Sequence, residues 1–240
     1  MAIREVPVPA LMAKLPRDQR GLPIPVMTMR DGAGRPLFTV NDGATTDRLI
    51  EQDRCPLCGN KFHRARWLVG GPLTAFHPNG AFIDPPMHGE CMRYALQVCP
   101  YLAAPKWTTL GTAELKFAQS DFGPDAIAVA TPHHPTPFRE RPALFIAVQF
   151  IGPCPVHTSP HSGNRMFTPR SYRQVQYWRH GAQLSKAEGE AATVAALKAY
   201  AAKLGEPIDD EMAADIAAFD AAVADLPSDE LKLLNLKDPK

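Results

Sequence analysis

Two short stretches, Cys55-Pro-Leu-Cys58-Gly59 and His88-Gly-Glu-Cys91, decide how this chain is organised. The first is a Cys-x2-Cys turn, which brings two sulfur atoms to one side of a tight chain reversal, and Gly59 permits the backbone conformation that such a turn needs. The second places an imidazole and a thiol three residues apart, on one face of the first turn of a helix. Zinc prefers four such ligands in a tetrahedron, so the spacing predicts a Cys3His zinc site.

The predicted ligand set also indicates the role of the Zn²⁺ ion. Cys55, Cys58, His88 and Cys91 fill all four positions and leave none for a water molecule or a substrate, so we expect a structural rather than a catalytic zinc. The N-terminus of the helix stabilises a thiolate at Cys91 through its dipole. A Cys-x2-Cys turn, a strand pair and a helix that carries ligands follow one another in the order of a treble-clef-like finger.

Other side chains and another chemistry compete with this assignment. Cys99 lies eight residues beyond Cys91, about 12 Å along a helix, which is too far to share one ion. His63 and His77 lie between the two ligand pairs, and either could replace His88, although neither has a cysteine three residues away. The Cys-x2-Cys pair could also be a redox pair, but such a pair usually follows a strand and opens a helix, whereas a glycine and two polar residues follow here.

Charge is unevenly distributed along the chain. Residues 1–186 hold 21 basic and 13 acidic residues, a net charge of +8, whereas residues 187–240 hold 5 basic and 12 acidic residues, a net charge of −7. A basic body permits an anionic partner, and it also attracts the acidic tail. Near the predicted ligands, basic side chains either offset the charge of −1 that three thiolates leave on Zn²⁺ or bind phosphate. These side chains are Arg54, Lys61, Arg64, Arg66 and Arg93.

Composition excludes several classes of protein. The 240 residues are 45% hydrophobic and 21% charged, as in globular proteins, but the 25 prolines are about twice the usual share, so much of the chain should be irregular. No apolar run is long enough to cross a membrane, and the first thirty residues contain no secretory segment. Five cysteines, an odd number, argue against a disulfide framework and for a reducing, cytoplasmic location.

The pattern of the chain predicts an α+β fold: a treble-clef-like zinc finger merged with a small antiparallel sheet, plus a C-terminal αα-hairpin. Residues 26–30 and 36–40 predict a hairpin, residues 45–53 a short helix with a threonine cap, and residues 66–69 a strand. Residues 73–86 are expected to be a loop or a second short strand. A helix should begin near Met87 and stop before Pro100.

The second half of the chain begins with the longest apolar run. Residues 143–151 predict a buried central strand, and residues 171–178 its antiparallel partner, after a long loop over 152–169. Ser185 and Glu188 form a capping box at the start of a helix with Val194, Leu197, Ala201 and Leu204 on one stripe. A second helix over 208–226 completes the hairpin. We therefore divide the chain into an arm (1–20), a zinc-containing α+β domain (21–184) and a helical hairpin with a tail (185–240).

A second group of candidate site residues lies in the loops beside the apolar strand. Histidines in loops next to a central strand are frequent catalytic groups, and the spacing Cys-x2-His-x3-His also fits a second metal. No carboxylate lies near them in the sequence, and the many prolines and glycines here also fit ordinary loops without a functional site. The residues are His133, His134, Cys154, His157 and His161.

The same motifs, in the same order, resemble an uncharacterised family of bacterial and phage-borne proteins with no established activity. The resemblance covers about residues 20–105 and 143–190. It implies a zinc site at the four residues named above and a mobile-element setting, and Leu73 and Thr74 stand where the family often carries a further cysteine. The motifs are Gly21-Leu-Pro-Ile-Pro25, Cys55-Pro-Leu-Cys58-Gly59, Gly71-Pro72, Pro85-Pro86-Met87-His88-Gly-Glu-Cys91, Tyr94-Ala95, Cys99-Pro100-Tyr-Leu102 and Tyr177-Trp178-Arg179-His180-Gly181.

Two functions of different kinds remain open. The first is a non-catalytic, zinc-stabilised protein that binds nucleic acid or a protein partner, with Trp67, Trp107 and Trp178 either as stacking surfaces or as core residues. The second is a hydrolase or nuclease that uses the loop histidines of residues 133–161. The C-terminal helices are also candidates for self-association, because their stripe can pack either on the sheet or on a second copy of the chain.

Overall fold

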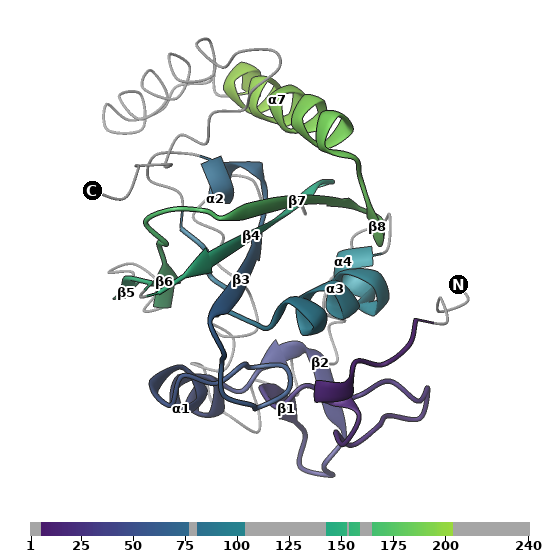
Figure 1. The fold of residues 1–240 in the computed structure, drawn as a ribbon. Coiled ribbons are helices and arrows are strands. Elements are labelled where there is room, and N and C mark those ends of the chain that lie inside the picture. Colours follow the sequence, from purple (N-terminus) through teal and green to yellow (C-terminus); the bar gives the residue numbers. More distant parts are fainter. Residues whose placement is uncertain (1–5, 77–80, 104–142, 153, 159–164, 204–240) are drawn as a thin grey trace.

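A computed structural model describes residues 6–76, 81–103, 143–152, 154–158 and 165–203 of the chain. At its centre is a four-stranded antiparallel sheet with the strand order β3-β4-β7-β8 (Figure 1). Its strands are β3 (Ala65–Gly70), β4 (Phe145–Ile151), β7 (Gln174–Arg179) and β8 (Ala182–Gln183). Two separate hairpins are formed by β1 (Thr28–Arg30) with β2 (Pro36–Asn41) and by β5 (Val156–Thr158) with β6 (Arg165–Phe167).

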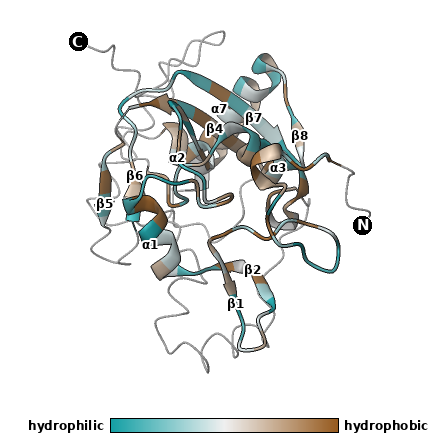
Figure 2. Cartoon of the chain, turned by 60° about the horizontal axis from the view of Figure 1, so that its bottom comes forward, coloured by the Kyte–Doolittle hydropathy of each residue, from teal (hydrophilic) through white to brown (hydrophobic). Residues whose placement is uncertain are grey.

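The predicted central strand is confirmed. β4 consists of apolar residues except for one glutamine, and it pairs on one side with β3 and on the other with β7. Ile146, for example, lies between Gly70 of β3 and Tyr177 of β7. Figure 2 shows the hydrophobic colour along this strand. β7 is the antiparallel partner that the alternation of residues 171–178 predicts.

The connection between these two strands is more regular than the sequence indicates. Residues 152–169, expected to be a loop, contain β5 and β6, and Phe167 of β6 exchanges backbone hydrogen bonds with Phe82. The strands are only three residues long and carry no clear alternation, so their pattern was too short to recognise. β7 and β8 join through His180 and Gly181, which both have a positive φ, as a type I′ turn requires.

Side chains alternate between the two faces of the sheet, and each face has its own core. One face carries Trp67, Phe145 and Trp178 and packs against α3. The other face carries Leu68, Ile146, Val148, Phe150 and Tyr177 and packs against α2 and α7. Figure 1 shows α7 and α2 on one side of the sheet and α3 on the other. We call these the metal-side face and the helix-side face.

The predicted helices begin and end close to their expected boundaries, but the first has a different cap, and the short helices at residues 10–12, 72–76 and 100–103 were not predicted. Asp42, not a threonine, caps the first helix, and its side chain accepts a hydrogen bond from the backbone N–H of Thr45 (2.6 Å). Residues 73–86, expected to be a loop or a strand, begin with a short helix that starts at Pro72, where a missing N–H costs nothing. The helices are η1 (Ala10–Met12, a 3-10 turn), α1 (Gly43–Glu51), α2 (Pro72–Phe76), α3 (Gly89–Val98), α4 (Pro100–Ala103) and α7 (Lys186–Lys203).

The capping box at the start of α7 is confirmed. The backbone N–H of Ser185 donates to the Glu188 carboxylate (3.0 Å), and the N–H of Glu188 donates to the Ser185 hydroxyl (3.3 Å). α7 lies on the sheet through Thr193 and Leu197, both fully buried, and through Gly189, where a Cβ would overlap the Tyr177 ring. The second helix of the predicted αα-hairpin, over 208–226, lies outside the described residues.

Residues 6–64 form a small lobe on the metal-side face of the sheet. It contains η1, the β1–β2 hairpin, α1 and the Cys-x2-Cys turn, and Met12 of η1 is buried in the same core as Trp67. The chain before β1 runs beside the turn, because the N–H groups of Val26 and Met27 donate to the carbonyls of Leu57 and Pro56. Among the described helices, none has the length and apolarity that a membrane crossing requires.

Candidate metal centre

The first two candidate ligands are placed by the end of α1. Asp53 follows this helix in a left-handed conformation (φ 55°), and Arg54 donates its N–H to the carbonyl of Leu49, which ends the helix in a Schellman motif. The chain then turns at Cys55, whose carbonyl accepts a hydrogen bond from the N–H of Gly59 (2.7 Å). Gly59 itself has φ 74°, so the glycine after the Cys-x2-Cys pair is required by the backbone.

The other two candidate ligands are placed by the start of α3. Met87 exchanges backbone hydrogen bonds with Trp67 of β3, which aligns the incoming chain with the sheet. His88 is the N-cap of α3, and Cys91 lies three residues later in the first helical turn. The close approach of α3 to β3 depends on Gly89, because a Cβ at this position would lie 2.7 Å from Nε1 of Trp67.

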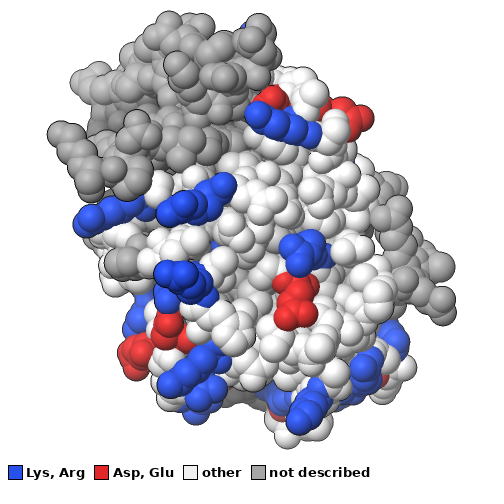
Figure 3. All heavy atoms as spheres, in the orientation of Figure 1, with Lys and Arg blue, Asp and Glu red and all other residues white. Residues whose placement is uncertain are grey.

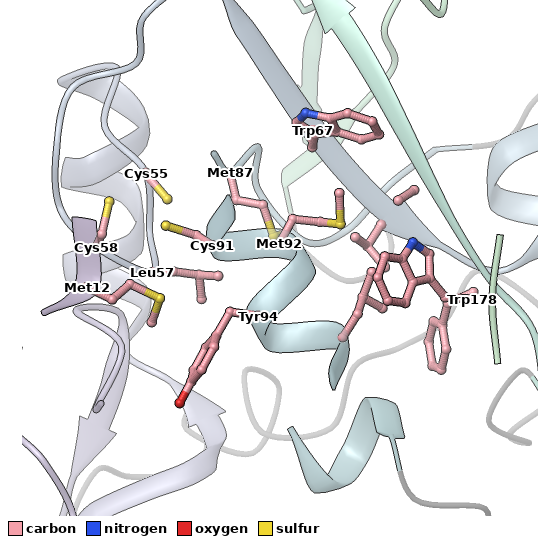
Figure 4. Close-up of a cluster of buried hydrophobic side chains, with 14 residues drawn as sticks. Met12, Cys55, Leu57, Cys58, Trp67, Met87, Cys91, Met92, Tyr94 and Trp178 are labelled. Atoms are coloured by element: carbon pink, nitrogen blue, oxygen red, sulfur yellow. The ribbon is translucent and has the colours of Figure 1, made fainter. Parts of the chain in front are cut away.

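These two segments bring four side chains into one compact cluster, which we call the Cys3His cluster: Cys55, Cys58, His88 and Cys91. All four residues are buried, and their ligand atoms all lie within 4.8 Å of one another. None of the three cysteines is in a disulfide. Figure 4 shows the three sulfur atoms side by side, between the turn and the first turn of α3. A tetrahedral ion with zinc–sulfur bonds of about 2.3 Å requires sulfur atoms about 3.8 Å apart, so the cluster is compatible with a metal site.

The imidazole of His88 is oriented for metal binding. Its Nε2 lies 3.1 Å from the carbonyl oxygen of Lys61, and its Nδ1 lies 3.3 Å from Sγ of Cys58. A carbonyl oxygen can only accept, so Nε2 carries a proton, and Nδ1 is the ring nitrogen that faces the cluster and would bind a metal. A backbone carbonyl that binds the second nitrogen of a ligating histidine is the usual arrangement around a protein-bound metal.

The three thiols differ in their pKa values. Hydrogen bonds from Cys55 and Cys91 lower the pKa of Cys58 to about 2, whereas burial raises the pKa of Cys55 to about 11. The neighbouring sulfur atoms of Cys55 and Cys58 raise the pKa of Cys91 as well. Without a metal, these shifts favour a thiolate at Cys58 and protons on Cys55 and Cys91. A cation that replaces these two protons would stabilise all three sulfur atoms as thiolates.

Of the five basic residues near the cluster in the sequence, two make contacts within the structure and three are exposed. Arg54 donates to the carbonyl of Gly59 (2.9 Å), within the turn. Arg66 pairs with Asp53 (2.9 Å) and lies over the ring of Phe62, 5.1 Å from its centroid. Lys61, Arg64 and Arg93 are exposed. The two half-buried arginines are thus held by contacts of their own, and the other three cations are exposed to solvent.

The competing ligands do not enter the cluster. Cys99 is the C-cap of α3, beyond the opposite end of the helix from His88. His63 is exposed, and its ring centroid lies 6.0 Å from that of His88. His77 lies outside the described residues. The choice of His88 and the exclusion of Cys99 therefore agree with the geometry of the cluster.

The structure describes only two of the five residues of the second candidate site. Cys154 is packed against the helix-side core, and burial raises the pKa of its thiol to about 12. His157 is exposed on β5, where its Nε2 lies 3.1 Å from the hydroxyl of Thr168. Within the part of the chain that the structure describes, neither residue belongs to a group that could hold a metal. His133, His134 and His161 lie outside that part.

Two of the candidate stacking residues are core residues. Trp67 is 3% exposed and Trp178 is 4% exposed, so neither offers a face to a base. Trp107 lies outside the described residues. In contrast, the carbonyl of Lys61 was not among the expected site groups, because a backbone acceptor has no signature in the residue types.

No protein-family model, no curated protein and no solved structure matches this chain, so the cluster is interpreted from its own geometry.

Proposed function

We propose that Cys55, Cys58, His88 and Cys91 hold one structural Zn²⁺ ion, and that this protein is a non-catalytic, zinc-stabilised binding module. The observation that carries the proposal is the orientation of His88, whose Nε2 donates to Lys61 while Nδ1 lies beside the sulfur atoms. A histidine that was merely packed in a core would not need its free nitrogen to lie among three buried thiols.

The donor set favours zinc over other common metals. Three sulfur atoms and one imidazole nitrogen are soft or borderline ligands, whereas Mg²⁺ and Ca²⁺ prefer oxygen. Four protein ligands that are all buried leave no open position for substrate, which favours a structural role over a catalytic one.

The arrangement around the proposed ion is treble-clef-like. A turn contributes Cys55 and Cys58 and the first turn of α3 contributes Cys91, but between them lie β3, which pairs with β4, and α2 in place of the predicted strand pair. In this interpretation the ion cross-links the small lobe to the helix that packs on the sheet. The excess of basic residues in the body of the chain supports a nucleic acid or an acidic protein as the partner. The resemblance to bacterial and phage-borne proteins is the basis for proposing a mobile-element setting.

Metal analysis of the purified protein tests the proposal. Protein prepared under reducing conditions without added metal should contain one zinc per chain, and replacement by Co²⁺ should give the visible absorption of a tetrahedral thiolate complex. Cys58→Ser should lose the metal, whereas Cys99→Ser, which removes a thiol outside the cluster, should retain it. Metal-free wild-type protein, or full metal content in Cys58→Ser, would refute the assignment.

A further inference from the structure

The segment Asn60–Arg66 runs from the Cys-x2-Cys turn into the first two residues of β3 and carries three Lys or Arg residues among its seven. Lys61, His63 and Arg64 are exposed, and Arg66 is half-buried. Within the described residues, Arg66 pairs with Asp53, whereas Lys61 and Arg64 belong to no ion pair. Two permanent cations within four residues, without an acidic partner, are available to an external anion.

The backbone of this segment is held by the Cys3His cluster. The carbonyl of Lys61 accepts the hydrogen bond from Nε2 of His88, and Lys61 also forms a β-bridge with Arg54. The next residue, Phe62, donates its N–H to the carbonyl of Asp53, and its ring lies 5.0 Å from that of His88. The segment is thus fixed through its backbone and through Phe62, which leaves the side chains of Lys61 and Arg64 in solvent.

The surrounding lobe extends the positive charge. Figure 3 shows several Lys and Arg side chains along the lower part of the molecule, where Figure 1 places α1, β1 and β2. Further exposed cations of this lobe belong to no ion pair among the described residues; they are Lys14, Arg17, Arg30 and Arg48. Residues 6–64 hold nine basic and six acidic residues, a net charge of +3, and a net positive charge attracts a polyanion.

We propose that the segment Asn60–Arg66 binds the phosphate backbone of a nucleic acid, and that the metal centre fixes the segment for this purpose. The inference rests on the proposed zinc site. Lys61 and Arg64 lie three residues apart and are both exposed, so each can contact a phosphate of a bound strand. Such contacts position a nucleic acid without reading its sequence. The repeated phosphates favour a nucleic acid over an acidic protein surface, on which charges are not regularly spaced.

A charge-matched pair of variants tests this proposal in the full-length protein. Lys61→Gln/Arg64→Gln removes two exposed cations but retains the Lys61 carbonyl, so metal content and folding should be unchanged. Arg179→Gln/Lys198→Gln removes the same charge from β7 and α7, where both side chains are exposed. Binding of labelled oligothymidylate and of a random-sequence DNA duplex is measured by fluorescence anisotropy over a series of salt concentrations, and zinc content is measured on the same samples.

We expect the segment variant to bind about tenfold more weakly than the control variant, and to lower the slope of log affinity against log salt by about two. Chelation of the metal from the wild type should weaken binding in the same way. Equal affinities and slopes for the two double variants, or stronger competition by polyglutamate than by oligothymidylate, would overturn the proposal.

Failure of the zinc site can be distinguished from failure of this proposal. Wild-type protein that contains zinc but binds neither nucleic acid contradicts the phosphate-binding segment alone. Protein without metal contradicts the zinc site, and unchanged binding after chelation contradicts the proposed dependence of the segment on the ion.

Discussion

The two faces of the central sheet are covered in different ways. On the helix-side face, α2 and α7 bury a continuous set of apolar side chains that includes Phe150 and Leu197, both at most 1% exposed. On the metal-side face, the apolar core of Trp67 and Trp178 continues through α3 into the buried cysteines, and beyond them lies the lobe of residues 6–64. Figure 4 shows this continuity from the tryptophans to the sulfur atoms.

The difference indicates where each region obtains its stability. Regular structure in the lobe is limited to η1, two short strands and α1, and the separate apolar cluster there contains only Met29 and Val40, with Leu37 beside them. This cluster alone cannot offset the conformational entropy of about 60 ordered residues, and the other buried apolar residues of the lobe, such as Met12 and Leu57, lie in the core that contains the cysteines. We infer that the helix-side face is stable by packing alone, whereas the lobe depends on the proposed ion.

Removal of one ligand should separate the two regions most clearly. Cys91→Ala should lose the metal, and because structural zinc contributes on the order of 10 kcal/mol to folding, the lobe should unfold. Hydrogen exchange should then increase sharply over residues 6–64, with β4 and β7 more protected. Cys99→Ala, which removes a thiol from the other end of α3, is the control. A lobe that stays protected in metal-free Cys91→Ala would show that packing alone holds it.

A cavity in the core of the helix-side face should have the opposite effect: the protein should become less stable but keep its zinc. Leu197 of α7 is fully buried against the sheet, so Leu197→Ala should lower the free energy of unfolding by about 2–5 kcal/mol. Denaturant unfolding and zinc analysis are carried out on the same samples, with the exposed Lys198→Ala as the control. The zinc content per chain should not change. Loss of zinc from Leu197→Ala would mean that the two faces are not energetically distinct.

The affinity for the metal should depend steeply on pH. The pKa of Cys58 is lowered, so its thiolate is already present at neutral pH, whereas the pKa values of Cys55 and Cys91 are raised and both remain protonated. Metal binding must therefore release about two protons, and the affinity should fall about 100-fold for each unit by which the pH is lowered.

Calorimetry in buffers of different ionisation enthalpy measures the number of protons released, and competition with a chelator at several pH values measures the affinity. The affinity should fall as the pH falls, because the metal competes with protons for the same sulfur atoms. Release of three protons would contradict the lowered pKa of Cys58, and release of none would contradict the raised values of Cys55 and Cys91.

The sequence predicted the parts of the molecule whose signals are local and strong. The apolar run over 143–151 can only be buried, and residue types at fixed spacing identified the four side chains of the Cys3His cluster. β5 and β6 were missed because three-residue strands have too short a pattern, and α2 because five residues beginning with Pro72 resemble a turn.

Features that depend on distant contacts could not be predicted. Met12 lies in a poorly patterned N-terminal segment, and only its position beside Leu57 in three dimensions makes it a core residue. The orientation of His88 depends on a backbone carbonyl 27 residues away in the chain. Trp67 and Trp178 could be stacking surfaces or core residues until the pairing of their strands placed both on one covered face.

The smallest expected effect concerns a helix end on the helix-side face. The Ser185 hydroxyl accepts a hydrogen bond from the N–H of Glu188 (3.3 Å), and Ser185→Ala should destabilise the protein by about 1 kcal/mol because this N–H then has no cap. Ser185→Asn, which retains an acceptor, should recover most of the loss in denaturant unfolding. Hydrogen exchange should increase at the start of α7 and stay unchanged over residues 6–64, because we expect the proposed metal centre, and not this helix, to hold the lobe. Equal stability of Ser185→Ala and the wild type would mean that water replaces the cap, and that α7 is held by Leu197 and its neighbours alone.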